Sequence, residues 1–268
     1  MYFYICIRWE DIVVQTRVTF IYDYKNIDIP EPFLELKIPD VETIVNVQCE
    51  ALARKHSKIQ LPAGQPHVLT DEMVKAEEIP GIETVDSYKE ALSYELPITL
   101  VSEHAHMLLM NYLIPQLVQR STFEINDEEA TQAGKDYYAV FEDNAKQKGL
   151  SLQEAARKHF GPNLDEGAVR QHLFLLGRTN FMFRILAGEY LRRQGQTFDI
   201  ASYSGYVKDM AKMSNATEEK VRELVPLNVY MDEVPALLMM DEMTAWLAPK
   251  IAIKTDEDDT EKEDQTEK

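Results

Sequence analysis

Signals that begin and end helices follow one another along most of this chain, and they constrain its fold more than any other feature. A Ser, Thr, Asp or Asn side chain at a helix start accepts a hydrogen bond from a free backbone N–H, and glycine commonly ends a helix. The start signals are Asn126 or Asp127, Ser151 with Glu154, Asp165 or Glu166, and Thr217, and the stop signals are Gly149, Gly161-Pro162 and Gly195. Only 10 of the 268 residues are glycine, which argues against a βαβ enzyme with phosphate-binding loops and against a many-turned sandwich. The sequence therefore predicts a mainly α fold.

The front of the chain differs from this pattern. Residues 12–22 are β-branched and aromatic and predict a strand, with which residues 2–7 can pair through a short turn. Prolines 30, 32 and 39 predict an extended connector, after which apolar residues at helical spacing predict a helix from Asp40 to His56. A short helix is expected over 70–78. Asp86 is expected to cap a longer one towards residue 120, with kinks or breaks at its two prolines, 97 and 115.

Charge excludes some partners. The formal net charge of -18 disfavours direct binding to nucleic acid and to anionic membranes. Residues 255–268 hold eight acids, two lysines and no apolar residue, so we expect a disordered acidic tail. The first residues contain Arg8, Glu10 and Asp11 within the apolar run, which does not fit a signal sequence. Two cysteines without a CxxC pair fit a reducing compartment, and we expect a cytoplasmic protein.

A search for catalytic chemistry finds no candidate. The Glu103-His104-Ala105-His106 run places its two histidines two residues apart, so on a helix they point in nearly opposite directions and cannot share a metal ion. There is no GxSxG, no P-loop and no GxGxxG. We expect no catalytic residue, no metal and no cofactor.

The apolar residues are more informative. Between residues 173 and 186 they occupy nearly the whole circumference of the longest predicted helix, wider than the stripe of a surface helix. Four of the eleven methionines fall within residues 231–243. Methionine is common on surfaces that accept varied apolar partners, although a core with gap-filling methionines would give the same pattern. The candidate residues of a hydrophobic cradle for unfolded chains are Phe174, Phe181, Met182, Met239, Met240, Met243 and Trp246.

Three segments resemble the carboxy-terminal domain of bacterial trigger factor. They are "LTDEMVKAEEIPGIETVDSYKEAL" (69–92), "LLMNYLIPQLVQRSTFEINDEE" (108–129) and "QKGLSLQEAARKHFG" (147–161). Their order and spacing carry the resemblance to about residue 253. Two earlier segments, "DYKNIDIPEP" (23–32) and "IPDVETIVNVQCEALARKHSKI" (38–59), resemble the linker strand and helix of that family.

The resemblance implies a missing domain. In family members the linker helix leads into a prolyl isomerase domain, whereas here a short "LPAGQPHV" stretch (61–68) follows it. The "GFRxGKxP" ribosome-docking loop is also absent from the sequence. The expected organisation is an N-terminal β or extended linker region (1–37), a linker helix (38–60), a junction replacing the isomerase domain (61–69), a trigger factor-like helical domain with projecting arms (70–253), and the acidic tail (254–268).

The function that this resemblance implies is an ATP-independent, holdase-like chaperone without isomerase activity, which binds unfolded or nascent polypeptides. The missing docking loop argues against association with the ribosome. The sequence does not decide whether the protein forms a homodimer. An alternative is a non-catalytic helical module that binds one folded partner or assists assembly.

Overall fold

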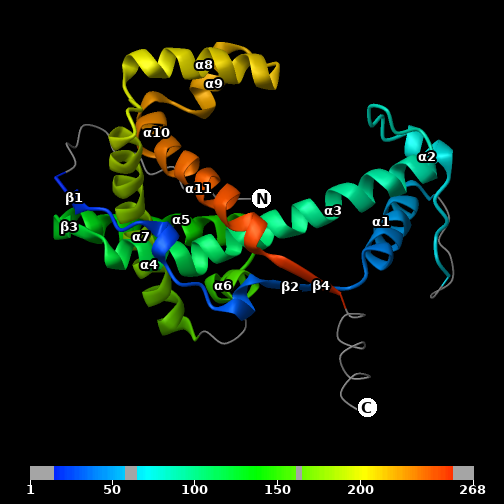
Figure 1. The fold of residues 1–268 in the computed structure, drawn as a ribbon, viewed down its shortest axis with the longest axis horizontal. Helices are drawn as coiled ribbons and strands as arrows, with labels where there is room; N and C mark the ends of the chain where they lie inside the picture. Colours follow the sequence, from blue (N-terminus) through cyan, green and yellow to red (C-terminus); the bar gives the residue numbers. More distant parts are fainter. Residues whose placement is uncertain (1–14, 58–64, 161–164, 256–268) are drawn as a thin grey trace. The chain divides into compact units, whose positions relative to one another are not determined.

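The computed structural model describes residues 15–57, 65–160 and 165–255, and these residues form a mainly helical protein with a few short strands (Figure 1). The predicted fold class is therefore confirmed. The chain divides into two compact units: unit 1 comprises residues 1–27 and 109–243, and unit 2 comprises residues 28–108 and 244–268. The predicted strand at 2–7, the stop signal at 161–162 and the predicted tail beyond residue 255 lie outside the described residues.

Most helices of unit 1 begin where the sequence predicts. Asn126, Asp165 and Thr217 each accept a backbone N–H with the side chain, and Ser151 and Glu154 form a reciprocal capping box. The elements of unit 1 are β1 (Arg17–Phe20), η1 (Tyr24–Asn26), the π-helix η3 (Leu109–Leu113), α4 (Ile114–Arg120), β3 (Thr122–Glu124), α5 (Asp127–Gln147), α6 (Leu152–Phe160), α7 (Glu166–Arg193), α8 (Ile200–Ser214), α9 (Glu218–Leu224), α10 (Leu227–Asp232) and most of α11 (Val234–Leu247).

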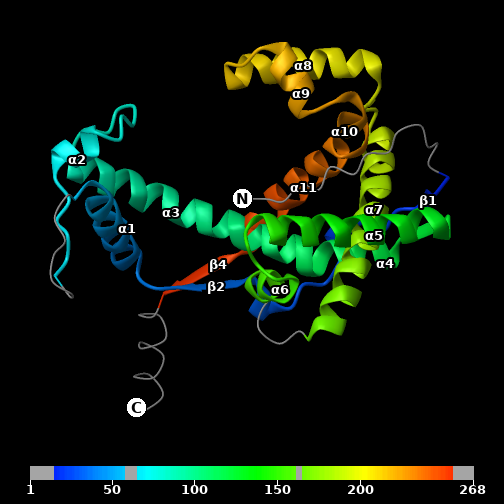
Figure 2. The same ribbon diagram turned by 180° about the vertical axis from the view of Figure 1, so that it is seen from behind.

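The crossing of α5 and α7 is the most extensive helix contact of unit 1, and Figures 1 and 2 both show α7 passing across α5 at a steep angle. Glycines make it close. A Cβ placed on Gly134 would lie 2.8 Å from the backbone oxygen of Phe174, and one on Gly177 would lie 2.8 Å from that of Ala133. Glycine at both positions lets the two backbones approach, because no side chain separates them.

The predicted strand 12–22 is observed as β1 over its central residues. β1 pairs antiparallel with β3, which directly precedes α5 and was not predicted as a strand. Glu129, in the first turn of α5, fixes the start of β1: it accepts hydrogen bonds from the backbone N–H groups of Gln15 and Thr16, at 2.6 and 2.9 Å, and from Thr16 Oγ1 at 2.7 Å.

Unit 2 is built around α1 and the first half of α3. Val45, Cys49, Leu52 and Ala53 of α1 form a buried cluster, onto which α3 packs with several partly buried side chains. The elements of unit 2 are η2 (Glu31–Leu34), β2 (Glu35–Ile38), α1 (Val41–His56), α2 (Asp71–Lys75), α3 (Val85–Leu108), η4 (Ala248–Lys250) and β4 (Ala252–Thr255). The predicted helix from Asp40 is thus observed, with Asp40 as its N-cap.

The long helix α3 differs from the prediction at its cap and at Pro97, whereas the predicted interruption near Pro115 is confirmed. Its first turn is capped by Thr84, whose hydroxyl accepts the Ser87 N–H, and not by Asp86. The helix passes through Pro97 without a break. Pro115 lies at the start of α4, directly after the π-helix, where its missing N–H is tolerated.

The observed units do not follow the predicted linear order. β2 and β4 pair in parallel, so a segment near residue 36 and one near residue 253 belong to the same unit. The region predicted as one helical domain, 70–253, is therefore divided between the two units. Lys254 and Thr255, predicted as the start of the tail, are strand residues.

Candidate functional site

Three of the seven candidate cradle residues are buried, and their expected exposure is wrong. Phe181 is 3% exposed and packs with Ala130 and Ala133 of α5. Met239 and Met243 lie one helical turn apart on α11 and are fully buried. Each gains more from the apolar interior than from solvent, so these side chains fill the core and are not available to a partner in this conformation.

The other four candidates are partly buried. Phe174 lies against Gly134 in the α5–α7 crossing, and Met182 packs against the cluster around Phe181. Met240 is half-buried on α11. Trp246 is also half-buried, and the ammonium of Lys250 lies 4.6 Å from its ring centroid. These positions fit structural roles, and the more exposed apolar side chains of the protein lie elsewhere.

The most exposed apolar stretch of a long helix lies on α3. Tyr94 is 74% exposed and Ile98 is 57% exposed, and the half-buried Val101 follows on the same face at helical spacing. We call these three residues the α3 patch. Residues 96–102, "LPITLVS", contain no charge, and Ala105 is the only buried residue of α3. Leu96, Leu100 and Val101 of this segment are partly buried, and Leu96 packs against the α1 cluster, whereas Ile98 and Thr99 are exposed. The solvent side of this segment is therefore uncharged, although a surface helix normally carries charges there.

The α3 patch was missed in the sequence, although a signal for it was present. Its residues belong to a run of apolar and small polar side chains with a proline in the middle, which predicted only a kink. Apolar residues on all sides of a helix normally indicate burial, and only the structure shows that this helix is largely open.

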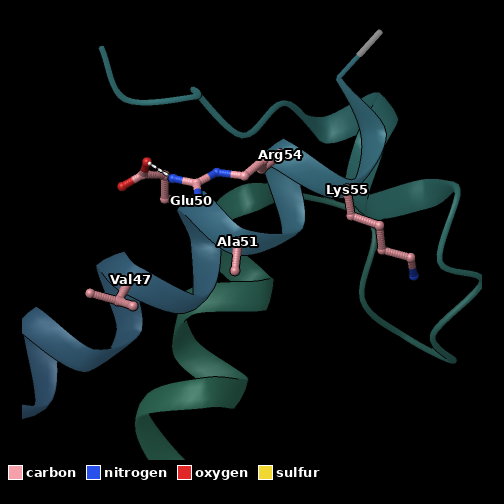
Figure 3. Close-up of a pocket in the computed structure, with 5 residues that line it drawn as sticks. All are labelled: Val47, Glu50, Ala51, Arg54 and Lys55. Atoms are coloured by element: carbon pink, nitrogen blue, oxygen red, sulfur yellow. Dashed lines mark hydrogen bonds and ion pairs between the residues drawn. The ribbon is translucent and has the colours of Figure 1, made fainter. Parts of the chain in front are cut away.

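A second surface is the outward face of α1. Val47, Glu50, Ala51, Arg54 and Lys55 line a shallow hollow of about 420 Å³, and Figure 3 shows the Arg54 guanidinium reaching to the Glu50 carboxylate. That ion pair is 2.8 Å long, and Lys55 is 2.7 Å from Glu77. Both cations are thus partnered by carboxylates, so this face offers an exposed Val47 between neutralised charges and not an anion site.

A third surface lies within unit 1, between β1, α7 and α10. We call it the β1–α7 hollow; its volume is about 270 Å³, and its lining residues are Thr16, Arg17, Val18, Arg184, Ile185, Gly188, Glu189, Met231 and Asp232. Arg184 Nη1 lies 2.6 Å from Asp232 Oδ2. Burial nevertheless raises the pKa of Asp232, and the Arg184 charge opposes this only in part. The lining combines apolar and charged side chains.

The hairpin of α8 and α9 shares a small core with α10 and the start of α11, and this core includes Tyr203, Val207, Val221, Tyr230 and Val234. The Tyr203 hydroxyl donates to the Val225 carbonyl at 2.7 Å and ties the two helices together. Met213 near its turn is 82% exposed, but its nearest exposed apolar neighbours in sequence, Ile200 and Leu224, lie 13 and 11 positions away. We therefore treat these three side chains as single exposed residues.

Across residues 15–57, 65–160 and 165–255, no group of three or more His, Cys, Asp or Glu side chains is arranged to hold a metal ion. His104 forms a 2.8 Å hydrogen bond to the Phe33 carbonyl through Nε2. Among the helices that the structure describes, none has the length and apolar character needed to cross a membrane.

No protein-family model matches this chain, and no curated protein is significantly similar to it in sequence. The resemblance to trigger factor therefore stays a prediction that rests on the segments quoted above.

Proposed function

We propose that this protein is an ATP-independent chaperone of the holdase type, which binds non-native polypeptides through exposed apolar helix surface. The observation that carries the proposal is the α3 patch, where Tyr94 and Ile98 are exposed one helical turn apart and Ile98 belongs to the uncharged stretch 96–102. The trigger factor-like order of segments supports the same function.

The energetics fit transient binding. Complete burial of one large apolar side chain contributes roughly 1.5–3 kcal/mol, so a few such residues give weak and reversible association once ordering costs are subtracted. The net charge of -18 favours solubility despite the exposed apolar residues. A holdase needs both properties, because it must release its substrates and must not aggregate itself.

The test is the suppression of aggregation of a chemically denatured reporter protein, measured by light scattering at equimolar chaperone. We expect the wild type to delay aggregation and the double variant Tyr94→Ser/Ile98→Ser to lose most of this capacity. Val68→Ser is the matched control, because Val68 is also highly exposed but lies outside the α3 patch. An inactive wild type would refute the proposal, and a fully active double variant would refute the role of the patch.

The same wild-type and variant proteins distinguish the holdase function from the alternative function, a module that binds one folded partner. The fluorescence anisotropy of labelled unfolded peptides should increase when the wild type is added. It should increase little when the double variant is added. Saturable capture of one folded protein, together with no response to unfolded peptides, would favour the assembly module.

A further inference from the structure

The β1–α7 hollow lies where the described chain begins. Thr16, Arg17 and Val18 form one of its walls, and the first described residue, Gln15, directly precedes them. The hollow therefore borders the point from which residues 1–14 extend.

Hydrogen bonds to α5 and its N-cap fix the positions of Gln15 and Thr16. The Glu129 carboxylate accepts the backbone N–H groups of Gln15 and Thr16, and Thr16 Oγ1 accepts the N–H of Asn126 at 2.9 Å. Hydrogen bonds to an ionised carboxylate are stronger than neutral ones. The preceding residues thus start from a defined place beside the hollow.

Residues 1–14, "MYFYICIRWEDIVV", are strongly apolar, and such a segment favours burial against other protein surface. Eleven of these fourteen residues are apolar, and the other three are Arg8, Glu10 and Asp11. Apolar surface of this size is unfavourable in water and is normally buried against protein.

The hollow offers matching chemistry. Ile185 and Met231 supply apolar contacts, and Met231 is 47% exposed, so it remains available. The charged side chains of the lining are already paired, Arg17 with Glu124, Glu189 with Arg192 and Arg193, and Arg184 with Asp232. The apolar residues of the segment, and not its charges, would therefore enter the hollow.

We propose that residues 1–14 dock intramolecularly into the β1–α7 hollow and cover it as a built-in occupant. The length permits this, since the seven Cα–Cα steps from Trp9 to Thr16 span at most about 25 Å when extended. An effect of this docking on substrate binding would rest on the proposed function, whereas the docking itself does not.

Tryptophan fluorescence tests the docking, because Trp9 and Trp246 are the only tryptophans. The full-length variant Trp246→Phe reports Trp9 alone. We expect Trp9 emission at shorter wavelength than in the urea-unfolded chain, with slower acrylamide quenching, independent of protein concentration. Adding Met231→Glu should shift the emission towards the unfolded value, whereas the control Met213→Glu, on α8, should leave it unchanged.

Three results would overturn the proposal. The first is a Trp9 side chain that is as accessible to acrylamide in the folded protein as in urea. The second is protection of Trp9 that disappears on dilution, which would indicate a second copy of the chain as the occupant. The third is protection that does not change with Met231→Glu, which would place the segment on another surface.

Cross-linking gives a readout that does not depend on the stability of the Met231→Glu variant. Cys6 lies within the segment, and Cys49 is the only other cysteine. In a Cys49→Ala background, Met231→Cys should form an intramolecular disulfide with Cys6 under mild oxidation, and Met213→Cys should not. Equal disulfide yields in the two variants, or no disulfide in the Met231→Cys variant, would contradict the docking.

Discussion

Tyr24 and Tyr190 donate hydrogen bonds to the same carboxylate oxygen, Oε1 of Glu242, at 3.0 and 2.7 Å. Their rings also meet edge to face, with centroids 6.3 Å apart. Because the three residues come from η1, α7 and α11, this junction joins the N-terminal segment of unit 1 to two of its helices.

Tyr24→Phe should lower the free energy of unfolding by about 1–3 kcal/mol, because the almost fully buried Tyr24 loses its bond to a charged acceptor. Urea denaturation measures the change. Tyr22→Phe is the control, since its hydroxyl makes two long hydrogen bonds at the surface, donating to the Asn26 carbonyl at 3.3 Å and accepting from Arg120 Nη1 at 3.4 Å. Its effect should stay within about 0.5 kcal/mol. Equal losses in both variants would contradict a specific role for the junction.

The same junction predicts sensitivity to high pH. Burial, followed by the hydrogen bond to Glu242, raises the pKa of both Tyr24 and Tyr190 above the ordinary value of 10.0. A raised folded-state pKa contributes stability that is complete below pH 10 and is lost as the pH rises further. Tyr24→Phe should therefore show a shallower loss of stability above pH 10 than the wild type, and parallel curves would refute this.

Glu129 predicts sensitivity to acid. Burial raises its pKa, but the hydrogen bonds from Gln15 and Thr16 outweigh this and leave the pKa below the ordinary 4.5. Its contribution is therefore present above pH 4.5 and is lost as the pH falls through the lower folded-state pKa. Glu129→Gln should lower stability at pH 7 by about 1.5–3 kcal/mol and flatten the acid limb of the stability profile. The exposed neighbour variant Glu128→Gln should change neither, and thermal unfolding between pH 3 and 7 measures both.

The helix glycines predict changes of opposite sign. Gly177→Ala should destabilise by about 1–3 kcal/mol, because its Cβ would lie 2.6 Å from Tyr137 Cβ and close to the α5 backbone. Gly205→Ala, on α8, meets nothing within 4 Å and should stabilise by up to about 1 kcal/mol through helix propensity. Chemical denaturation of both variants checks the pair, and a stabilised Gly177→Ala would show that α5 and α7 can separate at little cost.

Pro97 predicts a stabilising substitution. Inside α3 it provides no N–H for the carbonyl of Ser93, one turn earlier. Pro97→Ala should restore that bond and raise the stability of α3 by about 1 kcal/mol or more. Hydrogen exchange of the amides from residue 93 to 102 should slow, and unchanged or faster exchange would indicate that the proline fits a geometry that alanine does not improve.

The sequence allowed the helix starts to be predicted because capping is local. Asn126, Ser151 with Glu154, Asp165 and Thr217 each interact within three residues, so their patterns could be recognised without the fold. The prediction that Asp86 caps α3 was wrong for a related reason: Thr84 and Ser87 form a competing local cap.

Pairing and burial depended on the tertiary structure. β2 and β4 are separated by more than 200 residues, and no local signal links them. Phe181 and Ile98 are both large apolar residues on long helices, yet one is in the core and the other in solvent. By itself, the sequence determined where helices form, through side chains that reach their own backbone. Only the tertiary structure decided which apolar faces are covered, because burial depends on partners contributed by distant segments.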